Sequence, residues 1–530
     1  MHSDTPSRLT NAPFARWKQW ILVSVVCVAF GLHLWGIRRN LPFTQEMDEP
    51  VFVARAVRIA ATGDLNPHWF GNPGSTIIYP LAALYRMWYV LVHRGPLFGP
   101  AANLQVLFDS KPSAFYLSGR FLAIAYSVAS IPLVYRIGRR AFGERIALMG
   151  AWLSTLPQIA VAYAQMVRTD SAGTFFGLLA LWLCLRLYAR PTAKNHVIAG
   201  LAIGLGIATR YFLAILVFVL LLIEGLLGRQ ALRHGKFTVN WRGIGAGLFA
   251  VAVGFTLATP YFFPSFSTAL ADLRFEARST QLGADGLSPV ENLAWYLVDA
   301  IPWSITWPQA VLAVIGISVV LWKRAPRQTL LLVFVVMFLA ATSLSPLHWQ
   351  RWVIPILPVL VLFVACALDI VSVYISTRLR LRSEAQWRVA ISVLLLVSVW
   401  PLYQLVLSDI TQANPTTRIL AREWILQNLT PGSRIAQESF TAPLAGTGFV
   451  VSEQASLAEG RTLSDYRRAG YRYLVVSSYR YEKYLAEPNR FPSQVAFYRA
   501  LFSEERLLQQ FEPSLVRGGS VIRIYELRGP

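Results

Sequence analysis

The chain has 530 residues, of which 55% are hydrophobic and only 15% are charged, and its mean hydropathy is +0.45. Soluble globular proteins carry about 25% charged residues, and here the apolar residues also form blocks of the roughly 20 residues that a helix needs to cross a bilayer. This composition excludes a soluble protein. The formal charge of +21 does not indicate a nucleic-acid partner, because the basic residues lie in short clusters between apolar blocks.

The first apolar block, Trp20 to Gly36, follows the basic residues of the N-terminus. It is long for a signal peptide and lacks a small-x-small cleavage site, so we predict a retained membrane anchor. Ten further spans are expected near 116–135, 146–164, 171–188, 196–209, 211–227, 243–262, 304–322, 328–345, 352–374 and 389–408. The positive-inside rule places in the cytoplasm the N-terminus and the basic clusters within 136–145, 186–194, 229–242, 323–327 and 378–388.

The segment from Thr76 to His93 is apolar enough to be counted as a twelfth span, but we assign it to the outer membrane surface. Counting it would place the basic cluster at 136–145 outside, and it would put Arg86 inside the bilayer at a cost of about 2.5–3.5 kcal/mol. An amphipathic surface helix avoids both problems. The first external loop is then expected to run from residue 37 to 115.

After residue 408 the sequence becomes polar and mixed. Helical spacing is present from Thr416 to Asn428 and from Gln494 to Gln510, and strand-like runs occupy 434–437, 471–477 and 521–525. We therefore predict an α-helical polytopic membrane protein with about eleven transmembrane helices and a small C-terminal α/β soluble domain. The boundaries are 1–408 for the transmembrane domain and 409–530 for the soluble domain, which is extracytoplasmic because an odd number of spans precedes it.

Two acidic positions follow membrane spans on the predicted external side. The run Glu46-Met47-Asp48-Glu49-Pro50 suits a general base or a metal ligand, and it equally suits the N-cap of a helix that begins at Pro50. Asp170 closes the short loop at 165–170 and is open to the same two interpretations, as a site carboxylate or as the N-cap of a helix starting at Ser171.

Each of three short external turns contains a single arginine: Arg168, Arg210 and Arg351. The positive-inside rule does not favour arginine on this side, so each needs a local reason. Snorkelling to lipid headgroups is one reason, and binding of a phosphate through paired hydrogen bonds is another. Because all three shortest external turns share this feature, we favour an anion site. Arginines beside acidic loops indicate transfer chemistry on a lipid-phosphate substrate at the outer membrane surface.

Two further residues are supporting candidates for this site. Glu276 lies in the external loop at 263–303, where charges of alternating sign are typical of a solvated surface. His348 precedes Arg351, in a position where a structural interfacial histidine is more common than a ligand.

Short motifs in a fixed order resemble the polytopic GT-C glycosyltransferases, in particular the protein O-mannosyltransferase and aminoarabinose transferase group. The matching stretches lie in order over about residues 15–408: Met47-Asp48-Glu49-Pro50, Gly71-Asn72-Pro73-Gly74, Ile137 to Gly143, Val167-Arg168-Thr169-Asp170, Gly200 to Gly206 leading to Thr209-Arg210, and Arg351-Trp352 with Pro355 and Pro358.

The resemblance implies a donor in which a sugar is linked to a polyprenyl phosphate. It implies Asp48 as the catalytic base with Glu49 beside it, and Asp170 as a second acidic position. Arg210 stands where such enzymes often have lysine. Some members use a divalent metal ion and others do not, so the metal requirement stays open.

The function we predict is transfer of a hexosyl or pentosyl group to an acceptor hydroxyl on the extracytoplasmic face, with inversion at the anomeric carbon. In this hypothesis Asp48 activates the hydroxyl and the three arginines hold the departing lipid phosphate. The acceptor is a lipid, a glycan or a protein, and a bacterial inner membrane is the expected location. The alternatives are a lipid or solute transporter or flippase, and a non-catalytic protein that acts through residues 409–530.

Overall fold

The computed structural model describes residues 12–44, 48–232 and 239–528, and the chain divides into two compact units. The first unit contains residues up to 37 and 48–405, and the second contains 38–47 and 406–530. Glu46 and Met47 of the acidic motif lie outside the described residues, as does part of the basic cluster at 229–242. The predicted soluble domain, 409–530, lacks the segment 38–47, which belongs to the second unit.

The first unit is almost entirely helical. Its elements are α1 (Ala12–Trp35), α2 (Asp48–Thr62), α3 (Ser75–His93), α4 (Ala102–Ser110), α5 (Pro112–Ala141), α6 (Glu144–Leu153), α7 (Gln158–Ala164), α8 (Thr169–Ala189), α9 (Ala193–Thr209), η1 (Tyr211–Ile215), α10 (Leu216–Leu232), α11 (Trp241–Ala258), α12 (Phe266–Glu276), α13 (Pro289–Trp295), the π-helix η2 (Tyr296–Ala300), α14 (Ile301–Ile305), α15 (Trp307–Lys323), α16 (Pro326–Ser343), η3 (Gln350–Ile356), α17 (Leu357–Arg378) and α18 (Ser383–Ala413), which continues into the second unit.

Among the described residues, nine helices are long and apolar enough to cross a membrane. The number of candidate spans rises to eleven if each of two bent helix pairs counts as one span. The pair α6 and α7 bends by 63°, and the segment before Thr306 makes an angle of 116° with α15. The predicted fold class is confirmed: this is an integral membrane protein with a small sheet-containing unit at its C-terminus. The set of candidate spans includes α3, which the sequence assigns to the surface, and lacks α9, which the sequence counts as a span.

The charge of Arg86 in α3 is satisfied inside the first unit. Its guanidinium donates hydrogen bonds to the carbonyl oxygens of Leu97 at 2.8 Å and Ala60 at 2.9 Å, and also to that of Gly99. Arg86 is buried against the protein, so its charge alone is no argument against a bilayer position for α3. The surface location of α3 therefore stays a prediction.

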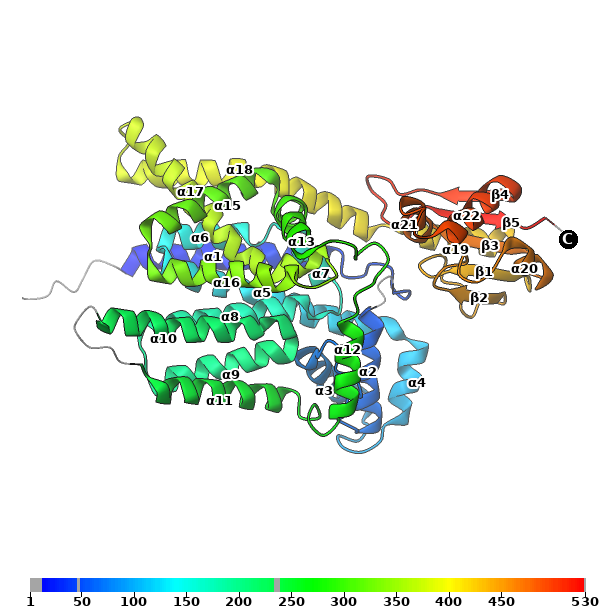
Figure 1. Cartoon of the computed structure of the whole chain (residues 1–530), viewed down its shortest axis with the longest axis horizontal. Coiled ribbons are helices and arrows are strands. Elements are labelled where there is room, and N and C mark those ends of the chain that lie inside the picture. The colour runs from blue at the N-terminus through cyan, green and yellow to red at the C-terminus, as the bar shows by residue number, and fades with distance from the viewer. Residues whose placement is uncertain (1–11, 45–47, 233–238, 529–530) are drawn as a thin grey trace, which may run out of the picture. The chain divides into compact units, whose positions relative to one another are not determined.

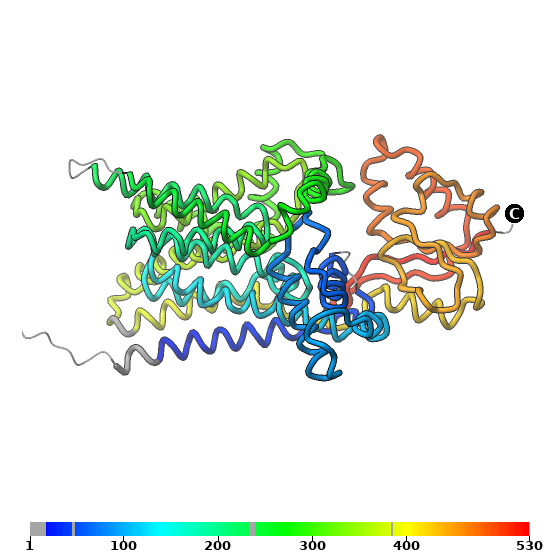
Figure 2. Tube along the Cα trace, turned by 90° about the horizontal axis from the view of Figure 1, so that it is seen from below, coloured from blue at the N-terminus to red at the C-terminus, as the bar shows by residue number. Residues whose placement is uncertain are grey.

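The turns with basic clusters and the loops with the candidate site lie at opposite ends of the long helices. In Figure 1 the end of α10, the start of α11 and the turn between α17 and α18 lie at the same end as the start of α1, and α12 lies at the other end. Figure 2 shows the same separation from a second direction. At that second end, α2, α4 and α12 run across the direction of the long helices (Figure 1).

The glycine run Gly200 to Gly206 packs α9 directly against α11. A Cβ atom added at Gly200 would lie 2.2 Å from the carbonyl oxygen of Gly247, and one at Gly204 would lie 2.3 Å from that of Val251. Small residues allow such close backbone approach between membrane helices. This motif therefore positions Arg210, the residue that follows α9, and has a packing role.

The second unit is a mixed five-stranded sheet in the order β2-β1-β3-β5-β4, with helices packed against it. Strand β1 pairs in parallel with β2 and β3, whereas β5 pairs antiparallel with β3 and β4. Its elements are α19 (Thr417–Asn428), β1 (Arg434–Glu438), β2 (Val450–Gln454), α20 (Leu463–Arg468), β3 (Tyr473–Ser477), α21 (Ser478–Ala486), α22 (Pro492–Glu504), β4 (Arg506–Phe511) and β5 (Ile522–Glu526). The helix predicted to continue to Gln510 was wrong at its end, because α22 stops at Glu504 and β4 follows.

Candidate active site

Asp170 lies at the centre of a buried ion-pair cluster at the start of α8. Its carboxylate is 1% exposed, and it accepts a hydrogen bond from Nε of Arg168 at 3.2 Å and another from Nη1 of Arg210. The helix begins at Thr169, and the N-cap residue is Arg168 in extended conformation, without a side-chain cap. The interpretation of Asp170 as the N-cap of a helix starting at Ser171 is therefore wrong.

Arg168 joins this cluster to the first acidic motif. Its Nη1 atom lies 2.5 Å from Oδ2 of Asp48, and its guanidinium lies over the ring of Tyr163 at 5.3 Å. Asp48 is the first residue of α2, so this helix begins two residues before the predicted start at Pro50. The side chain of Asp48 is 43% exposed, whereas that of Arg168 is 6% exposed. Asp48 is thus the accessible carboxylate of the cluster.

Arg210 reaches Asp170 from the break between α9 and η1. The backbone of Arg210 is extended there, with φ −148° and ψ 125°, in agreement with the predicted interruption at Thr209-Arg210. Its aliphatic stem passes Gly173 of α8 so closely that an added Cβ atom would lie 2.9 Å from Cδ of Arg210. The absence of a side chain at Gly173 therefore permits the Arg210–Asp170 pair.

Glu49 forms a separate ion pair with Arg120 of α5. Its two oxygens accept hydrogen bonds from Nε and Nη2 of Arg120 at 2.9 and 2.8 Å, and Oε1 also accepts one from the backbone N–H of Val167 at 2.9 Å. Arg120 donates a further bond to the carbonyl of Ile37. Both charged side chains are at most 2% exposed. The geometry makes Glu49 the anchor that holds α2 against α5 and the 166–168 segment.

Arg351 and His348 lie beside a cavity of about 320 Å³. The cavity is also lined by Trp295, Trp349 and Tyr163. The guanidinium of Arg168 lies over the ring of Tyr163. The charge of Arg351 is close enough to interact with those of the ion-pair cluster, and its guanidinium lies 4.6 Å from the centre of the Trp349 ring. The cavity therefore adjoins the cluster and is partly aromatic.

His348 lines this cavity. Its ring centre lies 4.6 Å from that of Trp295. Burial lowers the pKa of His348, and the charge of Asp285 opposes this change. Among the described residues, Nδ1 of His348 and Nε of Arg351 are buried without a hydrogen-bond partner.

Glu276 lies at the end of α12 and does not join the ion-pair cluster. Its carboxylate is 42% exposed and lies 3.5 Å from Nη1 of Arg278. The side chain of Glu276 also covers Gly71, where an added Cβ atom would lie 3.0 Å from its Cγ. The next residue, Asn72, donates a hydrogen bond to Oγ1 of Thr169 at 3.2 Å. The Gly71 to Gly74 motif thus packs between α12 and the start of α8.

The charges of the site favour an anion over a metal ion. Among the described residues, two carboxylates, Asp48 and Asp170, face three guanidinium groups, those of Arg168, Arg210 and Arg351, which leaves one positive charge unbalanced there. In the described part of the chain, no three His, Cys, Asp or Glu side chains lie together so that they could hold a metal ion. Both carboxylates are already paired with arginine, so this donor set does not fit a divalent cation.

Several residues of the site were not predicted. Arg120 lies inside a predicted span, and its role depends on Glu49, which is 71 positions away along the chain. A buried arginine in an apolar segment does signal a partner, because an unpaired charge is costly there. The aromatic lining residues Tyr163, Trp295 and Trp349 resemble ordinary interfacial aromatics in sequence and could not be singled out.

Comparison with known proteins gives a match to one family model over part of the chain. The family model described as dolichyl-phosphate-mannose-protein mannosyltransferase matches residues 114–258, which include Arg168, Asp170 and Arg210. Among curated proteins, none matches the sequence.

Solved structures of two proteins share the fold over most of the chain. ArnT from Cupriavidus metallidurans in the apo state is 15% identical, with a TM-score of 0.54, and the match covers 98% of this chain and 100% of ArnT. The structure of ArnT bound to undecaprenyl phosphate is 15% identical, with a TM-score of 0.52, and the match again covers 98% of this chain and 100% of ArnT. The apo oligosaccharyltransferase from Archaeoglobus fulgidus is 13% identical, with a TM-score of 0.54, over 92% of this chain and 73% of the archaeal protein. The resemblance to the GT-C glycosyltransferases predicted from the sequence is confirmed at the level of the fold.

Proposed function

We propose that the protein is a membrane glycosyltransferase that moves a sugar from a polyprenyl-phosphate carrier to an acceptor hydroxyl. The observation that carries the proposal is the cluster of three arginines around two carboxylates at the start of α8, with one positive charge unbalanced among the residues that the structure describes. The similar fold of ArnT, which has been solved with undecaprenyl phosphate bound, supports this class of donor.

The arginines bind the lipid phosphate in this mechanism. Arg210 and Arg168 are held by Asp170, so their guanidinium groups are oriented before the substrate arrives, and Arg351 contributes from η3. Planar guanidinium groups bind phosphate oxygens in pairs. As the bond between the anomeric carbon and the phosphate oxygen breaks, its electron pair moves to that oxygen. The fixed positive charges stabilise the growing negative charge, so no separate general acid is required.

Asp48 is the proposed base. It is the accessible carboxylate of the cluster, and Arg168 fixes its position through Oδ2. The acceptor oxygen attacks the anomeric carbon on the face opposite the phosphate, and its proton passes to Asp48. One C–O bond forms as another breaks, so the configuration at the anomeric carbon is inverted. Glu49 takes no part in the transfer in this mechanism, because Arg120 and Val167 already engage its oxygens.

The cavity beside Arg351 is proposed to hold the sugar. Aromatic walls with a few polar groups are typical of small-ligand sites, and the apolar face of a sugar ring would pack on Trp295 or Trp349. His348 and Arg351, which line the cavity, are proposed to bind sugar hydroxyls. A hexose and a pentose both suit this chemistry, and no metal ion enters the mechanism.

The site is proposed to face the extracytoplasmic side of a bacterial inner membrane. The basic turns lie at the opposite end of the long helices, where the positive-inside rule expects the cytoplasm. The unit at 409–530 is proposed to lie on the same side as the site, with a lipid, glycan or protein as the acceptor of the sugar.

The proposal is tested with membranes that contain the wild type, Arg210→Gln or Arg274→Gln, supplied with a radiolabelled pool of polyprenyl-phosphate sugars. Arg274 is an exposed arginine of α12 and serves as the matched control. We expect wild type and Arg274→Gln to transfer label, and Arg210→Gln to lose about 100-fold or more of the rate. Equal transfer by all three would contradict a phosphate-binding role for Arg210.

A further inference from the structure

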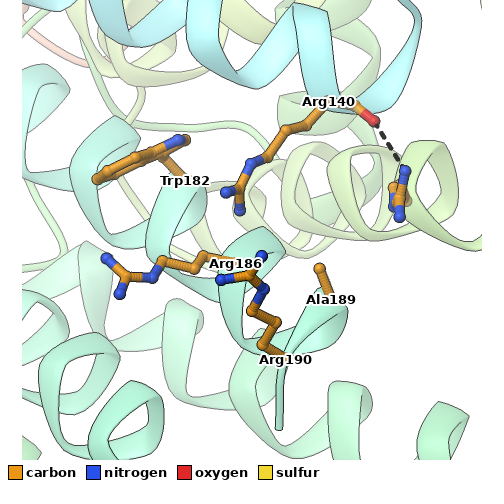
Figure 3. A pocket seen from close by; sticks show the side chains of 6 residues that line it. Arg140, Trp182, Arg186, Ala189 and Arg190 are labelled. Atoms are coloured by element: carbon orange, nitrogen blue, oxygen red, sulfur yellow. Dashed lines mark hydrogen bonds between the residues drawn. The ribbon is translucent and has the colours of Figure 1, made fainter. Parts of the chain in front are cut away.

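A second arginine-rich pocket lies far from the candidate active site, where α5, α8 and α16 end or begin. It has a volume of about 370 Å³ and is lined by Arg140, Trp182, Arg186, Ala189, Arg190 and Arg327. Figure 3 shows that the side chains of Arg140, from α5, and of Arg186 and Arg190, from the end of α8, extend into the same space beside Trp182. Four guanidinium groups from three helices therefore share one pocket.

These arginines lack acidic partners in the described part of the chain. No ion pair joins any of the four to a described carboxylate, and Nη1 of Arg140 is buried without a hydrogen-bond partner there. The pocket is held by other contacts: Arg327 donates to the carbonyl of Arg140 at 3.3 Å, and the guanidinium of Arg140 lies 5.9 Å from the centre of the Trp182 ring. Arg168 and Arg210 of the candidate active site differ in this respect, because Asp48 and Asp170 pair with them.

The pocket lies at the opposite end of α8 from the ion-pair cluster. Asp170 is in the first turn of this helix, and Arg186 is in its last turn. With a rise of 1.5 Å per residue, the two positions are about 24 Å apart along the axis. Helices α5, α8 and α16 each qualify as a membrane span. Their ends therefore lie at the level of the lipid headgroups on the other side of the membrane.

We propose that this pocket binds the phosphate group of an anionic lipid headgroup. Basic pockets between transmembrane helices on the cytoplasmic side are suited to anionic lipids, and guanidinium groups bind phosphate oxygens in pairs. The positive-inside rule accounts for arginines in this region, but not for their convergence on one cavity or for the unpartnered Nη1 of Arg140. A phosphate there would neutralise mutual repulsion among the four cations. The proposal does not depend on the transferase function.

The test measures binding of phosphatidylglycerol to the purified full chain in neutral detergent by native mass spectrometry, with phosphatidylcholine as the neutral comparison. The variants are Arg186→Gln/Arg190→Gln and, as a milder change at an exposed residue, Arg327→Gln. The control Arg378→Gln/Arg380→Gln removes the same charge from two exposed arginines of another basic cluster. We expect the double pocket variant to bind phosphatidylglycerol roughly tenfold to thirtyfold more weakly.

We expect Arg327→Gln to show a smaller loss and the control to change by about twofold or less, since its charges do not converge on a pocket. If both pocket variants bind like the control, the arginines form a general basic surface and the proposal is overturned. Inorganic phosphate added at millimolar concentration distinguishes the sources. If it displaces the lipid from the wild type, the pocket takes a soluble phosphate and the lipid assignment is wrong, whereas failure to compete supports the lipid headgroup.

Discussion

Replacing Glu49 with glutamine separates the structural carboxylate of the acidic motif from the catalytic one. The substitution removes one acceptor oxygen and the negative charge opposite Arg120, whose side chain is 2% exposed. A glutamine oxygen can accept from Val167 or from Arg120, but it cannot replace all three hydrogen bonds that Glu49 accepts. Breaking a buried ion pair by removing one partner costs about 3–5 kcal/mol. We therefore expect a marked loss of stability.

The structure also predicts the contrast with Asp48→Asn. Asp48 is half exposed and contacts Arg168 through Oδ2, so its replacement is expected to cost about 1 kcal/mol or less. Thermal unfolding in lipid nanodiscs, followed beside sugar transfer, distinguishes the two positions. Glu49→Gln lowers the melting temperature and with it the activity, whereas Asp48→Asn keeps the melting temperature and loses transfer.

A charge-conserving control makes the reasoning refutable. Glu49→Asp retains the carboxylate but shortens the side chain, so part of the stability and of the activity should return. If Glu49→Gln kept the melting temperature of the wild type and abolished transfer, the assignment of Glu49 to a structural ion pair would be refuted and a catalytic role would be favoured.

Three further predictions concern the cluster and the C-terminal unit. Asp170→Asn leaves the buried arginines without their carboxylate, so we expect lower thermal stability that added polyprenyl phosphate restores more strongly than in the wild type. Gly173→Ala forces the stem of Arg210 to shift beside Asp170, and we expect the KM for the donor to rise by about tenfold or less with a smaller loss of melting temperature than in Asp170→Asn. Burial raises the pKa of Glu438 from its ordinary value of 4.5 to about 7. The folded state therefore holds a proton that the unfolded state releases between these values, so the C-terminal unit loses about 3 kcal/mol as pH rises from about 4.5 to about 7. Hydrogen exchange of β1 and β3, corrected for intrinsic rates, measures this loss, which Glu438→Gln should abolish.

The membrane architecture could be predicted because it depends on the local composition of the sequence. Apolar blocks and basic turns give the spans and their alternation. The bends between α6 and α7 and at Thr306 were not predicted, since a break in a span depends on how the surrounding helices pack. In the C-terminal unit, β2 and β4 were missed because short strands at the sheet edges are defined by pairing with β1 and β5.

Part of the candidate site could also be predicted, because its arginines lie in short external turns, where the positive-inside rule does not favour a positive charge. The structure brings Asp48, Arg168, Asp170 and Arg210 into direct contact. The separate role of Glu49 could not be predicted, since adjacent residues on a helix point in different directions and the partner Arg120 is distant in sequence. The cavity beside Arg351 likewise depends on aromatics from separate segments.

The most direct test of the central claim compares sugar transfer by the wild type and by Asp48→Asn at equal abundance in membranes, from a pool of radiolabelled polyprenyl-phosphate sugars. The proposed mechanism predicts transfer by the wild type and its loss in the variant, with the variant still folded and still able to bind polyprenyl phosphate. Equal transfer by both would remove Asp48 from the mechanism. Absence of transfer by either, with donors and acceptors verified, would contradict the transferase assignment and favour a transporter.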